Sequence, residues 1–259
     1  KNMWGVGYNF MLHPLMSNQI YGELKENIEK YYNKTGQKSV ISGHSQGTSF
    51  VYIFIKYFVS KEWAQKYVDG VIFYAPAFAG WGTYGRLVSG NYGSSFPDSL
   101  ESMKISTMRM PGLHIMMPNE GVYGNETVIR NFPNQGDQAN ATLTSDLLKT
   151  LNRMDDTAYE IFKLTDVYRK PGLPEPPVPS LVIYNSAKST ANGYTYTPPS
   201  TVSGFSGKGD GTVASNGPDY ACRNWQNVQC YDYQDTNIDH SNIQDQQITI
   251  NLTFAFIEA

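Results

Sequence analysis

The sequence has little that would suit it to a membrane-spanning or polyanion-binding role. Its longest apolar stretch, 50–59, is interrupted by Lys56, whereas a membrane-spanning helix needs about 20 apolar residues. The net charge is −3 and no run of Lys or Arg occurs, so nucleic acid is not an expected partner. With 259 residues and 40% hydrophobic content, the chain is long and apolar enough to form one large packed domain rather than a disordered segment.

Cysteine is also scarce, because only Cys222 and Cys230 occur. They are close enough in sequence to pair, and a disulfide there would close a short loop and persist only in an oxidising compartment. The alternative is two free thiols. Four N-glycosylation triplets support an exported protein, although such triplets also arise by chance in an Asn-rich chain. The triplets begin at Asn33, Asn125, Asn140 and Asn251. We expect a secreted protein or one of the lysosomal or vacuolar lumen.

The first 78 residues predict the strand–helix–strand order of a parallel α/β sheet. Apolar residues at i, i+4, i+8 and i+11 indicate one helix, and Pro76 ends the second core strand. The predicted elements are a helix over 19–32, a turn over 33–38, a strand over 39–41, a buried helix over 48–57 and a strand over 68–75.

The rest of the chain predicts a cap or lid inserted into the core, followed by the remaining strands. From about 78 to 179 the alternation is lost, and the Pro-rich tract 171–179 returns the chain to the sheet. The expected domains are 1–78, a core with the nucleophile; 79–179, the cap or lid; and 180–259, a core with the acid and histidine loops. The later elements are an amphipathic stretch over 145–162, strands over 181–184 and 228–231, a polar, turn-rich stretch over 185–208, and a helix or extended segment over 247–258.

Gly43-His44-Ser45-Gln46-Gly47 matches the nucleophile-elbow pattern G-x-S-x-G. Small residues there permit a sharp turn that lifts the serine hydroxyl clear of a sheet. The pattern alone occurs by chance, but here it stands between a predicted strand and a predicted buried helix. Ser45 is therefore the candidate nucleophile, and the alternative is a tight turn without chemistry.

A serine nucleophile needs a histidine base and an orienting carboxylate. Among four histidines, His44 lies on the elbow and is expected to point away from the serine, while His13 and His114 precede any acid and break the chain order Ser, Asp/Glu, His. His240 remains as the candidate base, and the alternative is a surface histidine.

Asp210 is the candidate acid because it lies in the glycine-framed segment Gly207–Val213 after the strand at 181–184. Its competitors are Asp232, Asp235 and Asp239, and the alternative role is that of a turn residue bonding its own backbone. The segment lacks the spaced ligands of a calcium loop, so we expect neither a metal nor a cofactor.

An oxyanion needs two preorganised donors. The backbone N–H of Gln46 is one candidate, and the chain shows no convincing second donor upstream of it. We expect that donor, with N-terminal strands of the fold, on a further N-terminal piece, which is either cleaved and still associated as a second polypeptide of the same precursor or absent from this sequence.

With these residues in place, the chain resembles the lecithin:cholesterol acyltransferase and lysosomal phospholipase A family of α/β-hydrolases. GHSQG stands where that family has GHSLG, and GDGTV at 209–213 resembles its acid loop. The other similar segments are Gly7–Phe10, Trp63–Pro76, Ala221–Trp225 with its Cys-x-x-Trp, and Asp239–Ile243 around His240. The resemblance implies an α/β-hydrolase fold with a mainly parallel sheet and an inserted cap, and it carries Ser45, Asp210 and His240 over as the triad, with Gln46 as an oxyanion donor. The family's partner for the Cys222 equivalent lies in a strand matched by 181–185, which has no cysteine, so Cys230 would be a local substitute.

The resemblance also implies a function. Ser45 would attack an acyl ester of a glycerophospholipid at a membrane or lipoprotein surface, and the acyl group would pass to water or to an acceptor alcohol. The many Met and aromatic residues of 78–117 would suit the binding of acyl chains. The alternative is that these residues are ordinary members of the hydrophobic core. The rival hypotheses are a neutral-lipid lipase or esterase and a lipid-binding relative without turnover.

Overall fold

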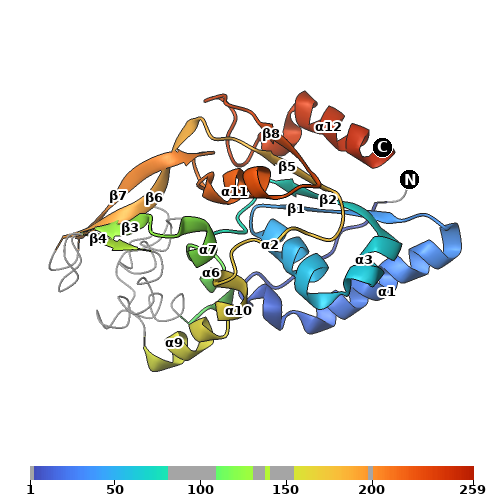
Figure 1. The fold of residues 1–259 in the computed structure, drawn as a ribbon, viewed down its shortest axis with the longest axis horizontal. Helices are drawn as coiled ribbons and strands as arrows, with labels where there is room; N and C mark the ends of the chain where they lie inside the picture. The colour runs from blue at the N-terminus through green and yellow to red at the C-terminus, as the bar shows by residue number, and fades with distance from the viewer. Residues whose placement is uncertain (1–2, 81–108, 131–137, 141–154, 198–200) are drawn as a thin grey trace.

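A four-stranded parallel sheet forms the centre of the molecule (Figure 1). The computed structural model describes residues 3–80, 109–130, 138–140, 155–197 and 201–259. The sheet has the strand order β1-β2-β5-β8, and all three neighbouring pairs run parallel. Its strands are β1 (Ser39–His44), β2 (Val68–Tyr74), β5 (Ser180–Tyr184) and β8 (Val228–Asp232). The predicted α/β fold with a parallel sheet is confirmed.

Apolar layers cover both faces of this sheet. Successive side chains of a strand point to opposite faces, so Val71 and Phe73 of β2 join one buried cluster, and Ile72 and Tyr74 join the other. Among the described residues, the helices that pack on the first face are α1 (Asn18–Thr35), α2 (Gln46–Ile53), α3 (Lys61–Tyr67) and α11 (Asn216–Asn224). The second face is covered by α12 (Gln247–Glu258) and the short 3-10 helix Ile243–Asp245. Figure 1 shows α12 and α2 on opposite sides of the sheet.

Two helices differ in length from the sequence prediction. Helix α1 includes 33–35, so the predicted turn is wrong there; the helix ends where Gly36 takes a φ of 71° and donates its N–H to the Tyr32 carbonyl at 2.7 Å, a conformation that glycine adopts without strain. The predicted buried helix over 48–57 starts earlier, as α2, and continues as a π-helical turn, Phe54–Phe58. The segment 247–258, left open between helix and extended chain, is helical.

A second sheet holds residues 188–197 and 201–209, which lie largely within the stretch 185–208 that the sequence predicted wrongly as turn-rich. Its strand order is β4-β3-β6-β7, and β6 and β7 form a long antiparallel hairpin. Thr, Tyr and Val favour strands over turns when pairing is available, and β6 also pairs in parallel with β3. The strands are β3 (Thr127–Arg130), β4 (Gln138–Asn140), β6 (Lys188–Thr197) and β7 (Thr201–Gly209).

In the described part of the segment between β2 and β5, four short helices occur. They are α6 (Pro111–His114), α7 (Glu120–Tyr123), α9 (Asp156–Lys163) and α10 (Asp166–Arg169). Helix α9 carries the end of the predicted amphipathic stretch, whose first part, 145–154, lies outside the described residues. From the sequence, the methionine and aromatic residues of 78–117 are expected to suit acyl chains. Of these, Phe78, Met116 and Met117 are buried in the protein, while those of 81–108 lie outside the described residues.

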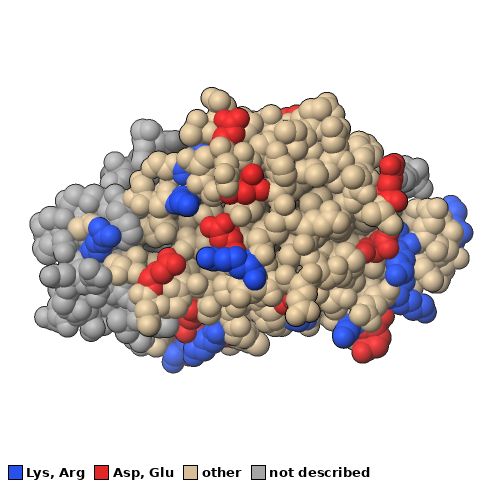
Figure 2. Space-filling model, turned by 45° about the horizontal axis from the view of Figure 1, so that its top comes forward, with Lys and Arg blue, Asp and Glu red and all other residues tan. Residues whose placement is uncertain are grey.

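The surface mixes charges of both signs. On the face in Figure 2, basic and acidic side chains lie near one another among many uncharged ones. In the described part of the chain, no helix is both long and apolar enough to span a bilayer.

Candidate active site

Ser45 lies on a strained turn between β1 and α2. Its φ of 55° and ψ of −128° are unfavourable for a residue with a side chain, and its N–H donates to the Tyr74 carbonyl of β2 at 3.1 Å. A Cβ on Gly43 would lie 2.6 Å from the Gly47 oxygen, so only glycine allows strand and helix to approach this closely. The local geometry is that of a nucleophile elbow.

Three predicted residues meet in one hydrogen-bonded chain. His240 Nε2 lies 2.8 Å from Ser45 Oγ, and His240 Nδ1 lies 2.7 Å from Asp210 Oδ2. Because an ionised carboxylate only accepts hydrogen bonds, Nδ1 carries the ring proton and donates a hydrogen bond to Asp210. The lone pair of Nε2 then faces the serine hydroxyl. The Asp210 side chain is 3% exposed and that of His240 13%, so the chain of bonds is largely shielded from water.

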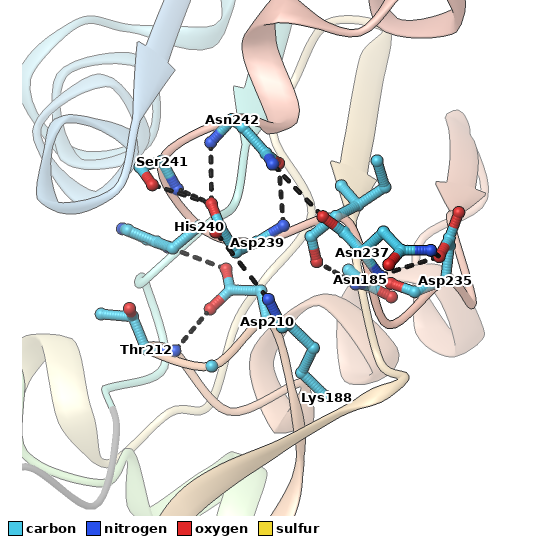
Figure 3. Close-up of polar contacts among 12 residues, drawn as sticks. Asn185, Lys188, Asp210, Thr212, Asp235, Asn237, Asp239, His240, Ser241 and Asn242 are labelled. Atoms are coloured by element: carbon cyan, nitrogen blue, oxygen red, sulfur yellow. Dashed lines mark hydrogen bonds and ion pairs between the residues drawn. The ribbon is translucent and has the colours of Figure 1, made fainter.

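The backbone of the acid loop fixes the carboxylate. Asp210 Oδ1 accepts the N–H groups of Thr212 at 2.9 Å and Val213 at 2.7 Å, as Figure 3 shows for Thr212. Gly211 adopts a φ of 91°, and a Cβ on Gly209 would overlap the Val213 carbonyl oxygen. The acid loop follows β7 along the chain, so strands β6 and β7 separate it from β5 in the sequence. The sequence did not predict these two strands.

The competing carboxylates make other hydrogen bonds, and Figure 3 shows those of Asp235 and Asp239. Asp239 Oδ1 accepts from Ser241 and Asn242, and the hydrogen bond from the Ser241 side chain is the main reason why the pKa of Asp239 is lowered. Asp232 accepts from Ser186, and Asp235 accepts from Asn237. The described contacts therefore join His240 to Asp210 rather than to these three.

His44 has a supporting role that the sequence prediction missed. Its Nε2 lies 2.8 Å from the backbone oxygen of His240, and since a carbonyl only accepts, Nε2 is the donor. Burial is the main cause of a lowered His44 pKa, which favours the neutral ring. The two imidazole rings lie 4.8 Å apart, so His44 braces the loop that presents His240. No pattern in the sequence marks this contact, because the two residues are 196 positions apart.

Gln46 begins helix α2, where a backbone N–H has no acceptor within its own helix. Its side chain makes contacts that the sequence also did not predict: Nε2 donates to the Phe10 carbonyl at 3.2 Å and to the Gly112 carbonyl at 2.9 Å.

The other two histidines are buried away from solvent, each 1% exposed. His13 Nδ1 accepts the Leu15 N–H at 3.1 Å and caps a short 3-10 helix. Burial, aided by the nearby charges of His114 and Arg169, lowers the pKa of His13 to about 3. A histidine held neutral in this way fits a structural role.

Cys222 and Cys230 form a disulfide that ties α11 to β8. Three of the predicted glycosylation sites, Asn33, Asn125 and Asn251, are exposed. The Asn140 side chain lies outside the described residues.

A parallel sheet covered on both faces, with a serine on a strained strand-to-helix turn, defines an α/β-hydrolase fold. The sequence model described as lecithin:cholesterol acyltransferase matches residues 1–168, which is more than half of the chain. The chain belongs to the lecithin:cholesterol acyltransferase family. The matched region includes Ser45 and Gln46 and ends before Asp210 and His240.

Comparison with curated protein sequences finds no match. Among solved structures, the chain is similar to the crystal structure of Paleococcus ferrophilus monoacylglycerol lipase. The identity is 13%, the TM-score is 0.34, and the similarity covers 92% of this chain and 74% of the lipase chain.

Proposed function

We propose that the protein is a serine acyl hydrolase or acyltransferase that cleaves a fatty acyl ester of a glycerophospholipid and forms an acyl-enzyme. The observation that carries the proposal is the hydrogen-bonded chain from Asp210 through His240 to Ser45. Family membership supports a lipid acyl ester as the substrate, and we further propose that this lipid is a glycerophospholipid.

The chemistry follows from the positions of the atoms. Ser45 Oγ attacks the ester carbonyl carbon while its proton passes to His240 Nε2, 2.8 Å away, and the resulting imidazolium is stabilised by Asp210. Collapse of the tetrahedral intermediate breaks the ester bond, and the leaving alcohol takes the proton from His240. Water or an acceptor alcohol then attacks the acyl-enzyme, again losing its proton to His240, which returns it to Ser45 Oγ.

The oxyanion would be bound first by the Gln46 N–H at the start of α2. We place the second donor on a further N-terminal polypeptide of the same precursor. Two features support such a partner: within the described sheets β1 pairs with β2 alone, so its other edge can accept a strand, and the N-terminal segment exposes Met3, Trp4 and Val6. Mass spectrometry of the natural protein under denaturing conditions tests this point, because a single polypeptide corresponding to this sequence alone would contradict it.

We also propose that the protein works at a membrane or lipoprotein surface after export through the secretory route. The disulfide and the exposed triplets at Asn33, Asn125 and Asn251 support export. Enzymatic removal of N-glycans should lower the mass of the natural protein. An unchanged mass would contradict glycosylation.

Product analysis tests the proposed reaction. Wild-type protein is incubated with phosphatidylcholine vesicles, with and without an acceptor alcohol, and in parallel with a triacylglycerol emulsion. We expect fatty acid and lysophospholipid from vesicles, and acyl ester when the alcohol is present, all absent with Ser45→Ala. Turnover of triacylglycerol alone would replace the phospholipid assignment with a neutral-lipid lipase, and folded wild-type protein that turns over neither would contradict catalysis.

A further inference from the structure

The side chain of Gln46 joins three segments that are far apart in the sequence. Its Nε2 carries two N–H groups, and the two acceptors within reach are the Phe10 carbonyl at 3.2 Å and the Gly112 carbonyl at 2.9 Å. The Gly112 N–H in turn donates to the Met11 carbonyl at 2.7 Å. The elbow, the N-terminal segment and helix α6 therefore meet at one junction, directly after the nucleophile.

The backbones at this junction are in close contact. A Cβ on Gly112 would overlap the Phe10 carbonyl oxygen, so no residue with a side chain fits there without a shift. Two residues before Phe10, the Tyr8 ring stacks on Phe50 of α2 with centroids 4.8 Å apart. The N-terminal segment is thus attached to the elbow helix through Tyr8 and through Gln46.

This attachment leaves three consecutive apolar side chains on the surface beside the elbow. Phe10 is 58% exposed, Met11 45% and Leu12 38%, and we call these three the apolar lip. Gln46 holds the backbone at Phe10 and Gly112 holds it at Met11, so the segment that carries these side chains is attached to the residue that follows Ser45. Exposed apolar groups gain free energy when they cover another apolar surface, and an acyl chain entering the site offers such a surface.

We propose that Gln46 is a positioning residue that sets the acyl-chain preference of the enzyme by holding the apolar lip beside Ser45. The inference rests on the proposed function, because the lip matters only if Ser45 takes acyl groups. It assigns the Gln46 side chain a role separate from that of its backbone N–H: the carboxamide acts on substrate selection and the N–H on the oxyanion.

Two soluble esters with the same leaving group test the proposal. The kcat and KM of p-nitrophenyl butyrate and p-nitrophenyl decanoate, both kept below the concentration at which they aggregate, are measured for wild type and for Gln46→Leu. Leucine has a similar size and lacks both donors. We expect the decanoate-to-butyrate ratio of kcat/KM to fall about tenfold, as two lost hydrogen bonds allow, and the change to appear mainly as a higher KM for decanoate.

Two further variants keep the result interpretable if Gln46→Leu folds poorly. Phe10→Ser retains the Phe10 carbonyl and its bond to Gln46 but removes one apolar side chain of the lip, so the ratio should fall in the same direction. Gln65→Leu is the matched control, because Gln65 is exposed on α3 and, among the described residues, its Nε2 donates to one acceptor, the Pro177 carbonyl at 3.5 Å. The ratio should stay at the wild-type value.

The outcomes separate this inference from the proposed function. If wild type hydrolyses both esters but Gln46→Leu and Phe10→Ser keep the wild-type ratio, the positioning role is wrong and the triad chemistry stands. An equal loss of kcat/KM for both esters in Gln46→Leu also overturns the inference, since it indicates damage to the elbow itself. Folded wild-type protein that hydrolyses neither ester contradicts the proposed function.

Discussion

Replacing Asp210 by Asn isolates the contribution of the carboxylate to catalysis. Asn has nearly the same shape, and its Oδ1 can keep the two backbone N–H groups of Thr212 and Val213. The Nδ2 group then faces His240 Nδ1, where the wild-type Oδ2 lies at 2.7 Å. Flipping the amide would set its donors against two backbone donors, so this orientation is the stable one.

The consequence is the wrong tautomer of His240. Because Nδ2 only donates, His240 must accept at Nδ1 and carry its proton on Nε2, where it can no longer take the proton of Ser45. We expect kcat to fall about ten-thousandfold, or ~5.5 kcal/mol in the activation free energy. Retention of the backbone bonds should leave the free energy of unfolding within ~1 kcal/mol of wild type.

The assay is the steady-state hydrolysis of p-nitrophenyl butyrate, with urea unfolding measured on the same preparations. Asp232→Asn is the matched control, because the Asp232 carboxylate accepts from Ser186 and, within the described part of the chain, does not bond to His240. The kcat of this variant should stay within about threefold of wild type, which corresponds to less than the free energy of one hydrogen bond. Near-normal kcat in Asp210→Asn, or a larger loss in Asp232→Asn, would refute the reasoning.

Three further predictions concern the supports of the site. His44→Phe keeps a ring but removes the donor to the His240 carbonyl, so kcat should fall about tenfold, the equivalent of one hydrogen bond; an unchanged kcat would deny the brace. His13 has a pKa of about 3 when folded against about 6.5 when unfolded, so below about pH 6.5 the unfolded state binds a proton that the folded state does not. The free energy of unfolding should therefore decrease as the pH is lowered, by ~2 kcal/mol between pH 6.5 and 4.5. His13→Asn, which keeps a cap acceptor, should flatten this part of the pH profile of urea unfolding, and an identical slope would contradict the assignment. Replacing Cys222 and Cys230 by Ala should lower the free energy of unfolding by ~2–3 kcal/mol, as expected for a short disulfide loop, and no loss would show that the bond adds little.

The sequence predicted the central sheet because its signals are local. The end of strand β2, residues 71–74, is a continuous run of buried apolar and aromatic residues. The glycines around Ser45 mark a tight turn through residues that are adjacent in the sequence. Ser45, Asp210 and His240 were found by residue type and chain order, which survive any change in the intervening loops.

The features that the sequence did not predict depend on contacts between distant segments. Strands β6 and β7 mix Thr, Tyr and Val, which favour strands, with Gly, Ser and Asn, which favour turns. Their pairing with each other and with β3 decides for the strands. The bond from His44 to the His240 backbone and those from Gln46 to Phe10 and Gly112 end on carbonyl oxygens. Every residue has such an oxygen, so no side-chain pattern could point to the acceptor.

Peptide mapping after treatment with a fluorophosphonate tests the central claim most directly, because this reagent reacts with activated serine hydroxyls far faster than with ordinary ones. We expect one adduct, on the peptide that contains Ser45. It should be absent in Ser45→Ala and should form several orders of magnitude more slowly in His240→Ala. Folded wild-type protein with no adduct on Ser45, or with an adduct that forms equally fast without His240, would contradict the claim.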